Sequence, residues 1–151
     1  MATPWKLPVA DQPLRGHHTK DLGDLGVLKA QLDLFRQGYV VLVPLTEHAP
    51  FDLAIEREGR CRTVQVKTRT LNGHGAIEVQ FRSCWTDRRG THYERSRSKK
   101  VDLYCVYNPE TDLCYYLNPA DFGRSVTLRV RAPKNGQMQR INFASDYREV
   151  P

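Results

Sequence analysis

What this 151-residue sequence lacks excludes several classes of protein. No apolar run approaches the roughly 18 residues that a membrane-spanning helix needs. The first residues contain prolines and polar side chains instead of the apolar block of a signal peptide. None of the four cysteines belongs to a C-x-x-C pair, the spacing typical of zinc and redox sites. We therefore expect a cytoplasmic protein with reduced, mostly buried cysteines and no membrane segment.

Internal repeats and low-complexity tracts are also absent, and the length suits one domain with a single hydrophobic core. The composition, 40% hydrophobic and 26% charged, is ordinary for a soluble globular protein. We assign the proline-containing residues 1–19 to a flexible N-terminal tail and residues 20–151 to one compact domain.

Positive charge is concentrated in one segment of the chain. The net charge is +6, yet residues 57–100 alone contain 12 Lys or Arg and 4 Asp or Glu, against 11 and 13 in the remainder. A basic stripe on an otherwise near-neutral domain is typical of a surface that binds a polyanion. A solvated basic face that improves solubility is the alternative.

Hydrophobic periodicity predicts one long helix followed by a series of strands. Four apolar residues recur at helical spacing: Leu25, Leu28, Leu32 and Phe35. They indicate a helix over residues 21–37. Strands are expected at residues 39–43, 51–55, 62–68, 76–81, 101–108, 113–119 and 126–133. The polar residues 83–100 are expected to form a long loop, and the order of elements predicts a mixed α/β sheet with a flanking helix.

A carboxylate and a lysine lie on two consecutive strands of this pattern. Asp52 is at the start of one strand, Lys67 is near the end of the next, and a Glu58-Gly59 turn joins them. If the strands pair across the turn, both side chains emerge near the same end of the sheet. A carboxylate there can bind a hard divalent cation, and a lysine can stabilise charge on a phosphate. Phosphodiester hydrolysis needs both groups, although an ordinary hairpin with a surface Asp and Lys is the alternative.

These residues resemble a known motif. "PFD" followed by "VQVK" at residues 64–67 is similar to the PD-(D/E)XK motif of the restriction-endonuclease-like nucleases. Three longer blocks, "GDLGVLKAQLDLFRQGYVVLVPLTEHAPFDLAIE", "VDLYCVYNPETDLCYYLNP" and "LRVRAPKNGQMQRINFASDY", resemble the group I intron-associated homing endonucleases of that superfamily. The likeness runs from about residue 20 to residue 147. It implies a restriction-endonuclease-like mixed β-sheet flanked by helices, and a homing-type endonuclease that hydrolyses double-stranded DNA.

The resemblance implies roles for individual residues. Asp52 would be the principal metal ligand, Gln65 would occupy the second acidic position of the motif, and Lys67 would be the catalytic lysine. The backbone carbonyl of Val66 would be a further metal ligand. The implied cofactor is Mg²⁺, for which Mn²⁺ could substitute. Glutamine is common at the position of Gln65 in this family, and its amide oxygen can bind a hard cation while supplying less negative charge.

The helix departs from the family pattern. The family helix usually reads G-D-x-G-E, whereas this sequence reads "GDLGV", so Val27 replaces a glutamate of the site. Asp24 is a candidate substitute ligand, although an acid near a helix N-terminus is also favoured there by the helix dipole. With Val27 and Gln65 uncharged, Asp52 could be the only carboxylate of the site. A catalytically impaired DNA-binding protein that keeps the nuclease fold is therefore the second interpretation.

The basic segment supplies candidate DNA contacts: Arg82, Arg88, Arg89, Arg95, Arg97, Lys99 and Lys100. Such side chains neutralise phosphates, and arginine can also read guanine. One active site cuts one strand, so cleavage of a duplex predicts a homo-oligomer, a dimer or a tetramer. An unrelated basic protein of structural type is the third alternative.

Overall fold

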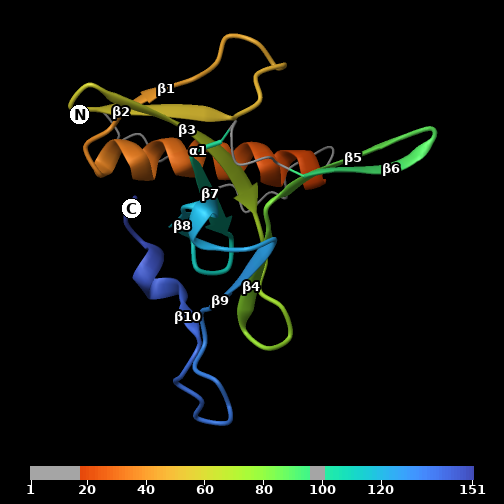
Figure 1. Ribbon diagram of the computed structural model, residues 1–151, viewed down its shortest axis with the longest axis vertical. Coiled ribbons are helices and arrows are strands. Elements are labelled where there is room, and N and C mark those ends of the chain that lie inside the picture. Colours follow the sequence, from red (N-terminus) through yellow and green to blue (C-terminus); the bar gives the residue numbers. More distant parts are fainter. Residues whose placement is uncertain (1–17, 96–100) are drawn as a thin grey trace, which may run out of the picture.

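A five-stranded mixed sheet forms the centre of the computed structural model (Figure 1). Residues 18–95 and 101–151 are described, with backbone alone at residues 18, 82–87 and 91–95. The sheet has the order β1-β2-β3-β7-β8, with strands β1 (Val40–Leu42), β2 (Leu53–Arg57), β3 (Arg60–Thr68), β7 (Leu103–Asn108) and β8 (Leu113–Leu117). β3 and β7 run parallel, and the other neighbours run antiparallel. The mixed sheet that the sequence predicts is therefore confirmed.

The helix α1 (His18–Arg36) covers one face of this sheet and buries Ala30 and Leu34 completely. It approaches β3 closely at Gly26, where an added Cβ would lie 2.1 Å from Thr68 Oγ1. Thr68 Oγ1 donates a hydrogen bond of 2.9 Å to the carbonyl of Leu22. A glycine is therefore required where the first half of α1 crosses the end of β3.

The apolar stripe that indicates this helix in the sequence is not the face that packs on the sheet. Leu28, Leu32 and Phe35 are 62%, 48% and 70% exposed. The expected helix is present and starts three residues earlier than predicted; of the four residues that indicate it, Leu25 packs partly buried against the core and the other three are exposed. The physical reason is that α1 has apolar residues on two sides, and the side with the small residues Gly26 and Ala30 allows the closer approach to the strands.

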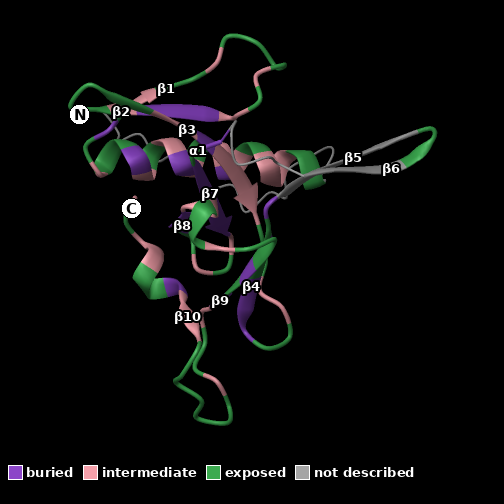
Figure 2. Ribbon diagram, in the orientation of Figure 1, coloured by how far each residue is buried: buried purple, intermediate pink, exposed green. Residues whose placement is uncertain are grey.

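A second, three-stranded sheet packs on the opposite face of the central sheet. It has the order β10-β9-β4, with strands β4 (Ala76–Gln80), β9 (Ser125–Arg129) and β10 (Asn142–Phe143). Its buried residues, among them Val79 and Leu128, share an apolar cluster with Tyr104 and Val106 of β7. The central sheet is thus enclosed between two apolar layers, and much of β2, β4 and β7 is buried (Figure 2). Two short 3₁₀ helices, Pro119–Asp121 and Ala144–Tyr147, complete the structure.

The polar stretch expected as a loop over residues 83–100 contains a β-hairpin instead. Its strands β5 (Arg82–Asp87) and β6 (Gly90–Arg95) pair antiparallel and project from the body of the molecule (Figure 1). The loop prediction is wrong because the sequence of these two strands is mostly polar and lacks the apolar alternation by which a half-buried strand is recognised. Residues 96–100 lie outside the described part of the chain.

The sequence also predicts reduced, mostly buried cysteines and no membrane-spanning helix. Cys105 and Cys114 are buried as free thiols, and Cys61 is a free thiol that is exposed. The side chain of Cys84 lies outside the description. No helix among the described residues is long and apolar enough to cross a membrane.

Candidate active site

The alternation of side chains along β3 places Gln65 and Lys67 on the face of the central sheet that is turned away from α1. In the parallel register with β7, Gln65 pairs with Tyr104 and Lys67 pairs with Val106. Paired residues of a sheet share a face, and both partners belong to the cluster under the three-stranded sheet.

Asp52 reaches the same place from the start of β2. Its Oδ2 accepts a hydrogen bond of 2.5 Å from Gln65 Nε2 and one of 2.7 Å from the backbone N–H of Val66. Its own backbone N–H donates to the carbonyl of Val64 at 3.0 Å. The Asp52 side chain is therefore held in one position by β3, directly before the first paired residue of β2.

Burial disfavours the ionised form of the Asp52 carboxylate. Desolvation by burial raises the pKa of Asp52 above its ordinary value, against the lowering effects of the hydrogen bond from Val66 and the charge of Lys67. Desolvation therefore outweighs the stabilising effects of the Val66 N–H and of Lys67 on the charged form of Asp52.

Lys67 is close enough to influence this carboxylate, since its charge lowers the pKa of Asp52. Its Nζ also lies 5.6 Å from the centre of the Tyr104 ring, an arrangement in which the ring face attracts the ammonium group. Tyr104 is only 2% exposed, so this contact fixes the lysine stem against a rigid part of the core.

The backbone of Val66 faces Asp52 as well. In a strand, the N–H and the C=O of one residue point to the same side. Because the N–H of Val66 donates to Asp52, its carbonyl is also directed toward the chain that leads into the start of β2. Asp52, Gln65, Val66 and Lys67 are therefore brought together as the sequence predicts they should be, although their roles stay predictions.

These oxygen groups fit a hard cation. Among the described side chains, no group of three His, Cys, Asp or Glu lies close enough to hold a metal ion. A metal ion beside Asp52 would therefore depend on one carboxylate, neutral oxygens and water. Mg²⁺ usually keeps several waters and uses one or two carboxylates, which matches this set of ligands.

The two helix positions are on α1. Val27 is partly buried and packs against the cluster between α1 and the central sheet, together with Val66. Asp24 is exposed on α1, one turn before Val27. Its role as a ligand stays a prediction.

Comparison with known proteins gives two matches. A sequence model of the family described as PD-(D/E)XK endonuclease matches residues 17–150. The chain belongs to this family. A solved structure of a bacterial homing endonuclease, I-Ssp6803I, is similar with a TM-score of 0.70 and 27% sequence identity, over 87% of this chain and 89% of that chain. None of the curated proteins is a significant match.

Membership of the PD-(D/E)XK family confirms the restriction-endonuclease-like fold and a nuclease as the class of protein. The third alternative, an unrelated basic protein, is excluded. Within this family, divalent metal ions are the general cofactors and DNA is the implied substrate.

The predicted DNA contacts fall on the β5–β6 hairpin and beyond it. Arg88 and Arg89 are exposed at its turn. Arg82 and Arg95 are at its base, with side chains outside the description. Three further predicted contacts lie wholly outside the described residues: Arg97, Lys99 and Lys100.

Sequence reasoning missed a second basic segment. Residues 122–145 contain five Arg or Lys and no Asp or Glu. The charge count hid this segment because acidic residues elsewhere in the chain cancel it in the sum. A count in a sliding window would have found it.

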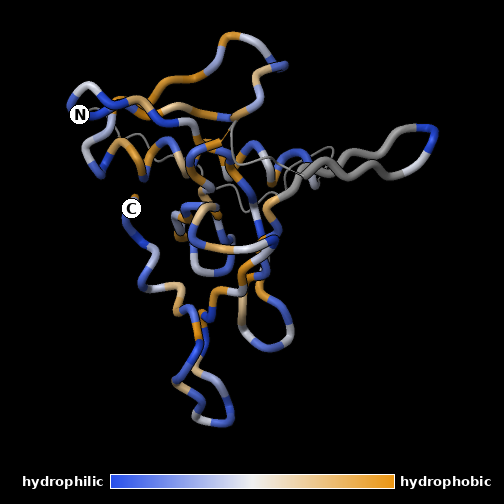
Figure 3. The backbone as a smooth tube through the Cα atoms, viewed as in Figure 1, coloured by the Kyte–Doolittle hydropathy of each residue, from blue (hydrophilic) through white to orange (hydrophobic). Residues whose placement is uncertain are grey.

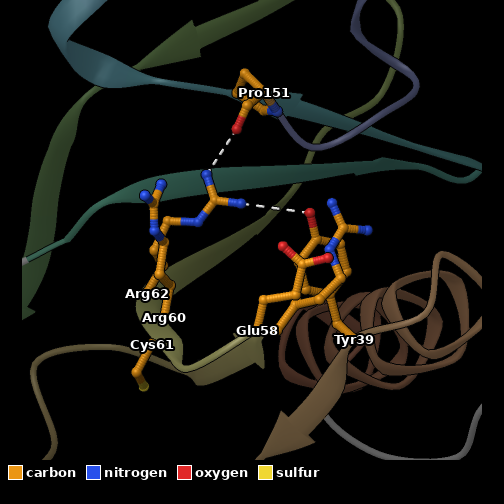
Figure 4. Close-up of a pocket in the computed structure, with 7 residues that line it drawn as sticks. Tyr39, Glu58, Arg60, Cys61, Arg62 and Pro151 are labelled. Atoms are coloured by element: carbon orange, nitrogen blue, oxygen red, sulfur yellow. Dashed lines mark hydrogen bonds between the residues drawn. The ribbon is translucent and has the colours of Figure 1, made fainter.

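An arginine-lined hollow of about 690 Å³ lies at the other end of β2 and β3 (Figure 4). Arg62 donates to the carbonyl of Pro151 at 2.6 Å and to Tyr39 Oη at 3.4 Å. The hairpin turn lies roughly 16 Å along the strand from Asp52, at about 3.3 Å per residue. The hollow is therefore separate from the candidate active site.

Proposed function

We propose that this protein is a metal-dependent endonuclease that hydrolyses phosphodiester bonds of double-stranded DNA. The observation that carries the proposal is the convergence of Asp52, Gln65 and Lys67 at one strand end in a chain of the PD-(D/E)XK family. The similarity to a bacterial homing endonuclease favours a homing-type nuclease, and the sequence blocks favour the group I intron-associated branch.

The residues of the site have distinct tasks. Asp52 and the carbonyl of Val66 would hold Mg²⁺ or Mn²⁺, with Gln65 near the metal or its water. When bound, the metal would polarise the phosphoryl oxygen and make water a stronger nucleophile. Lys67 places its ammonium beside the same position, where it stabilises negative charge that develops on the phosphate.

Gln65 also positions the Asp52 side chain. Its Nε2 donates to Asp52 Oδ2, so it fixes the orientation of the carboxylate, while Oε1 stays available as an acceptor. Because the amide carries no charge and Val27 replaces the glutamate of the family helix, Asp52 supplies the negative charge alone. We therefore expect weaker metal affinity than two carboxylates would give.

Cleavage of both strands requires two sites, and the surface of α1 supports an oligomer. Leu28, Leu32 and Phe35 form an exposed apolar stripe on the side of the helix away from the sheet. Exposed apolar patches of this kind commonly mark protein interfaces. A homo-oligomer, a dimer or a tetramer, would cover the stripe and supply a second active site.

Conversion of supercoiled plasmid tests the function. With Mg²⁺ or Mn²⁺, the protein should produce nicked and linear DNA, and with EDTA it should produce neither. A second candidate function, a DNA-binding protein without catalysis, is favoured by Val27. It predicts retarded plasmid with no nicked product at any metal concentration.

A further inference from the structure

The second basic segment lies on the three-stranded sheet. Its five basic residues lie directly before β9, on β9 and in the loop to β10: Arg124, Arg129, Arg131, Lys134 and Arg140. This loop is largely hydrophilic and extends away from the rest of the molecule (Figure 3). Neither the motif nor the predicted DNA contacts of residues 82–100 include any of these side chains.

The basic segment is connected to the side of the molecule that carries the catalytic residues. β9 begins beside the junction of β4 and β5, where the backbone N–H of Phe81 donates to the carbonyl of Arg124 at 3.1 Å. The inner residues of β9 pack in the cluster that contains Tyr104, and Lys67 lies over the ring of Tyr104. The segment therefore starts next to the base of the β5–β6 hairpin and continues away from it (Figure 1).

The basic side chains are available to a ligand. Arg124, Arg131, Lys134 and Arg140 are exposed, and none of them forms an ion pair within the described part of the chain. Arg129 is partly buried and donates to the carbonyl of His74 at 2.7 Å, which leaves its charge uncompensated.

The acidic residue of these three strands is Glu78, which is exposed and accepts a hydrogen bond from Asn72. Asp121 and Asp146 flank the segment at its two ends, so three acidic residues face five basic ones and leave a net charge of +2. The excess is concentrated in the loop, because residues 130–141 contain three basic residues and no acidic one, and this loop is complementary to a polyanion.

The dimensions suit duplex DNA. The eight residues from Arg124 to Arg131 are seven steps apart and extend over roughly 23 Å at about 3.3 Å per step. A DNA strand carries one phosphate for each 3.4 Å or so of helix axis, so a stretch of this length accompanies about seven base pairs.

We propose that β9 and the loop between β9 and β10 bind the sugar–phosphate backbone of the duplex beside the scissile phosphate. The proposal rests on the proposed function, because it assigns the DNA-binding surface of that same nuclease. Together with the β5–β6 hairpin, it gives the enzyme two basic arms that start at the same junction. Arg131, Lys134 and Arg140 contact phosphates, so they govern affinity and salt dependence rather than chemistry.

A pair of charge-matched triple variants tests the proposal. The test variant is Arg131→Gln, Lys134→Gln and Arg140→Gln. The control variant is Arg36→Gln, Arg57→Gln and Arg60→Gln, which removes the same charge from exposed positions at the end of α1 and at the arginine-lined hollow (Figure 4). Binding of a fluorescein-labelled DNA duplex of mixed sequence is measured by anisotropy in EDTA, at salt concentrations from about 50 to 200 mM. Thermal melts verify that both variants are folded.

The proposal predicts that the test variant binds at least about tenfold more weakly than the parent protein at 0.1 M salt, with a salt slope less negative by roughly 2 to 3. The control should bind within about threefold of the parent, since long-range charge is largely screened at this salt concentration. Equal losses in the two variants, or an unchanged test variant, would overturn the proposal while leaving the nuclease function intact. A parent protein that binds no duplex DNA would overturn both.

Discussion

Replacing Asp52 with asparagine separates the contribution of its carboxylate to DNA cleavage from its effect on the stability of the fold. The variant keeps an oxygen that can accept the hydrogen bonds from Gln65 and Val66. It loses the charge that would bind the metal. Metal stabilisation of a phosphoryl transition state is worth several kcal/mol, so plasmid cleavage should fall by about 10³-fold or more.

The same substitution should stabilise the metal-free protein at neutral pH. Because burial raises the pKa of Asp52 in the folded state, the folded protein holds this proton more tightly than the unfolded chain. The stabilisation from this group is present below the ordinary pKa of 3.8 and is lost as pH rises through the folded pKa. In EDTA, the melting temperature of Asp52→Asn should therefore exceed that of the parent at neutral pH, and the difference should shrink toward pH 4.

Metal should stabilise the parent protein but not the Asp52→Asn variant. At about 100 times its dissociation constant, Mg²⁺ should stabilise the parent by about 2.7 kcal/mol, or roughly 5–10 °C, and leave Asp52→Asn unchanged. Glu56→Gln is the control, because Glu56 is a partly buried acid of the same strand that bonds to Gly59. Equal metal stabilisation of Asp52→Asn and the parent would refute the placement of the metal site.

Four further substitutions test the packing of α1 and the role of its exposed stripe. Val27→Glu puts a carboxylate against the apolar cluster under α1 and should cost about 1–3 kcal/mol of unfolding free energy; an unchanged melting temperature together with tighter metal binding would instead show that the position belongs to the site. Gly26→Ala should cost about 1–3 kcal/mol because its Cβ meets Thr68, whereas Gly23→Ala, with nothing within 4 Å, should stabilise the helix by up to about 1 kcal/mol. Phe35→Glu should leave the melting temperature nearly unchanged, reduce the oligomer measured by light scattering and favour nicked over linear plasmid; an unchanged oligomer would exclude the α1 stripe as the interface.

The site was more predictable than the packing around it. The positions of the Asp52 and Lys67 side chains can be predicted from the sequence, because a tight turn and strict strand alternation fix where they emerge. The face of α1 that packs on the sheet cannot be predicted in this way, since the exposed Leu28 and Leu32 have the same helical spacing as the buried Ala30 and Leu34. Only the close approach of Gly26 to Thr68 decides between the faces, and this contact joins residues far apart in the sequence.

The β5–β6 hairpin could not be predicted for a related reason. Its strands project from the domain, so they carry no alternation between an apolar and a polar face. The sequence predicts a loop at Arg88 and Arg89, whereas they lie at the turn between the two paired strands. The hairpin therefore became visible only from its backbone pairing.

The central claim is that Lys67 and Asp52 belong to one hydrolytic site, and Lys67→Ala tests it most directly. Duplex binding in EDTA and plasmid cleavage in Mg²⁺ are measured on the same preparations of parent and variant. Because Lys67 is one cation among many for binding but lies beside Asp52, the account predicts nearly unchanged affinity and loss of cleavage. Cleavage by Lys67→Ala at the rate of the parent protein would contradict it.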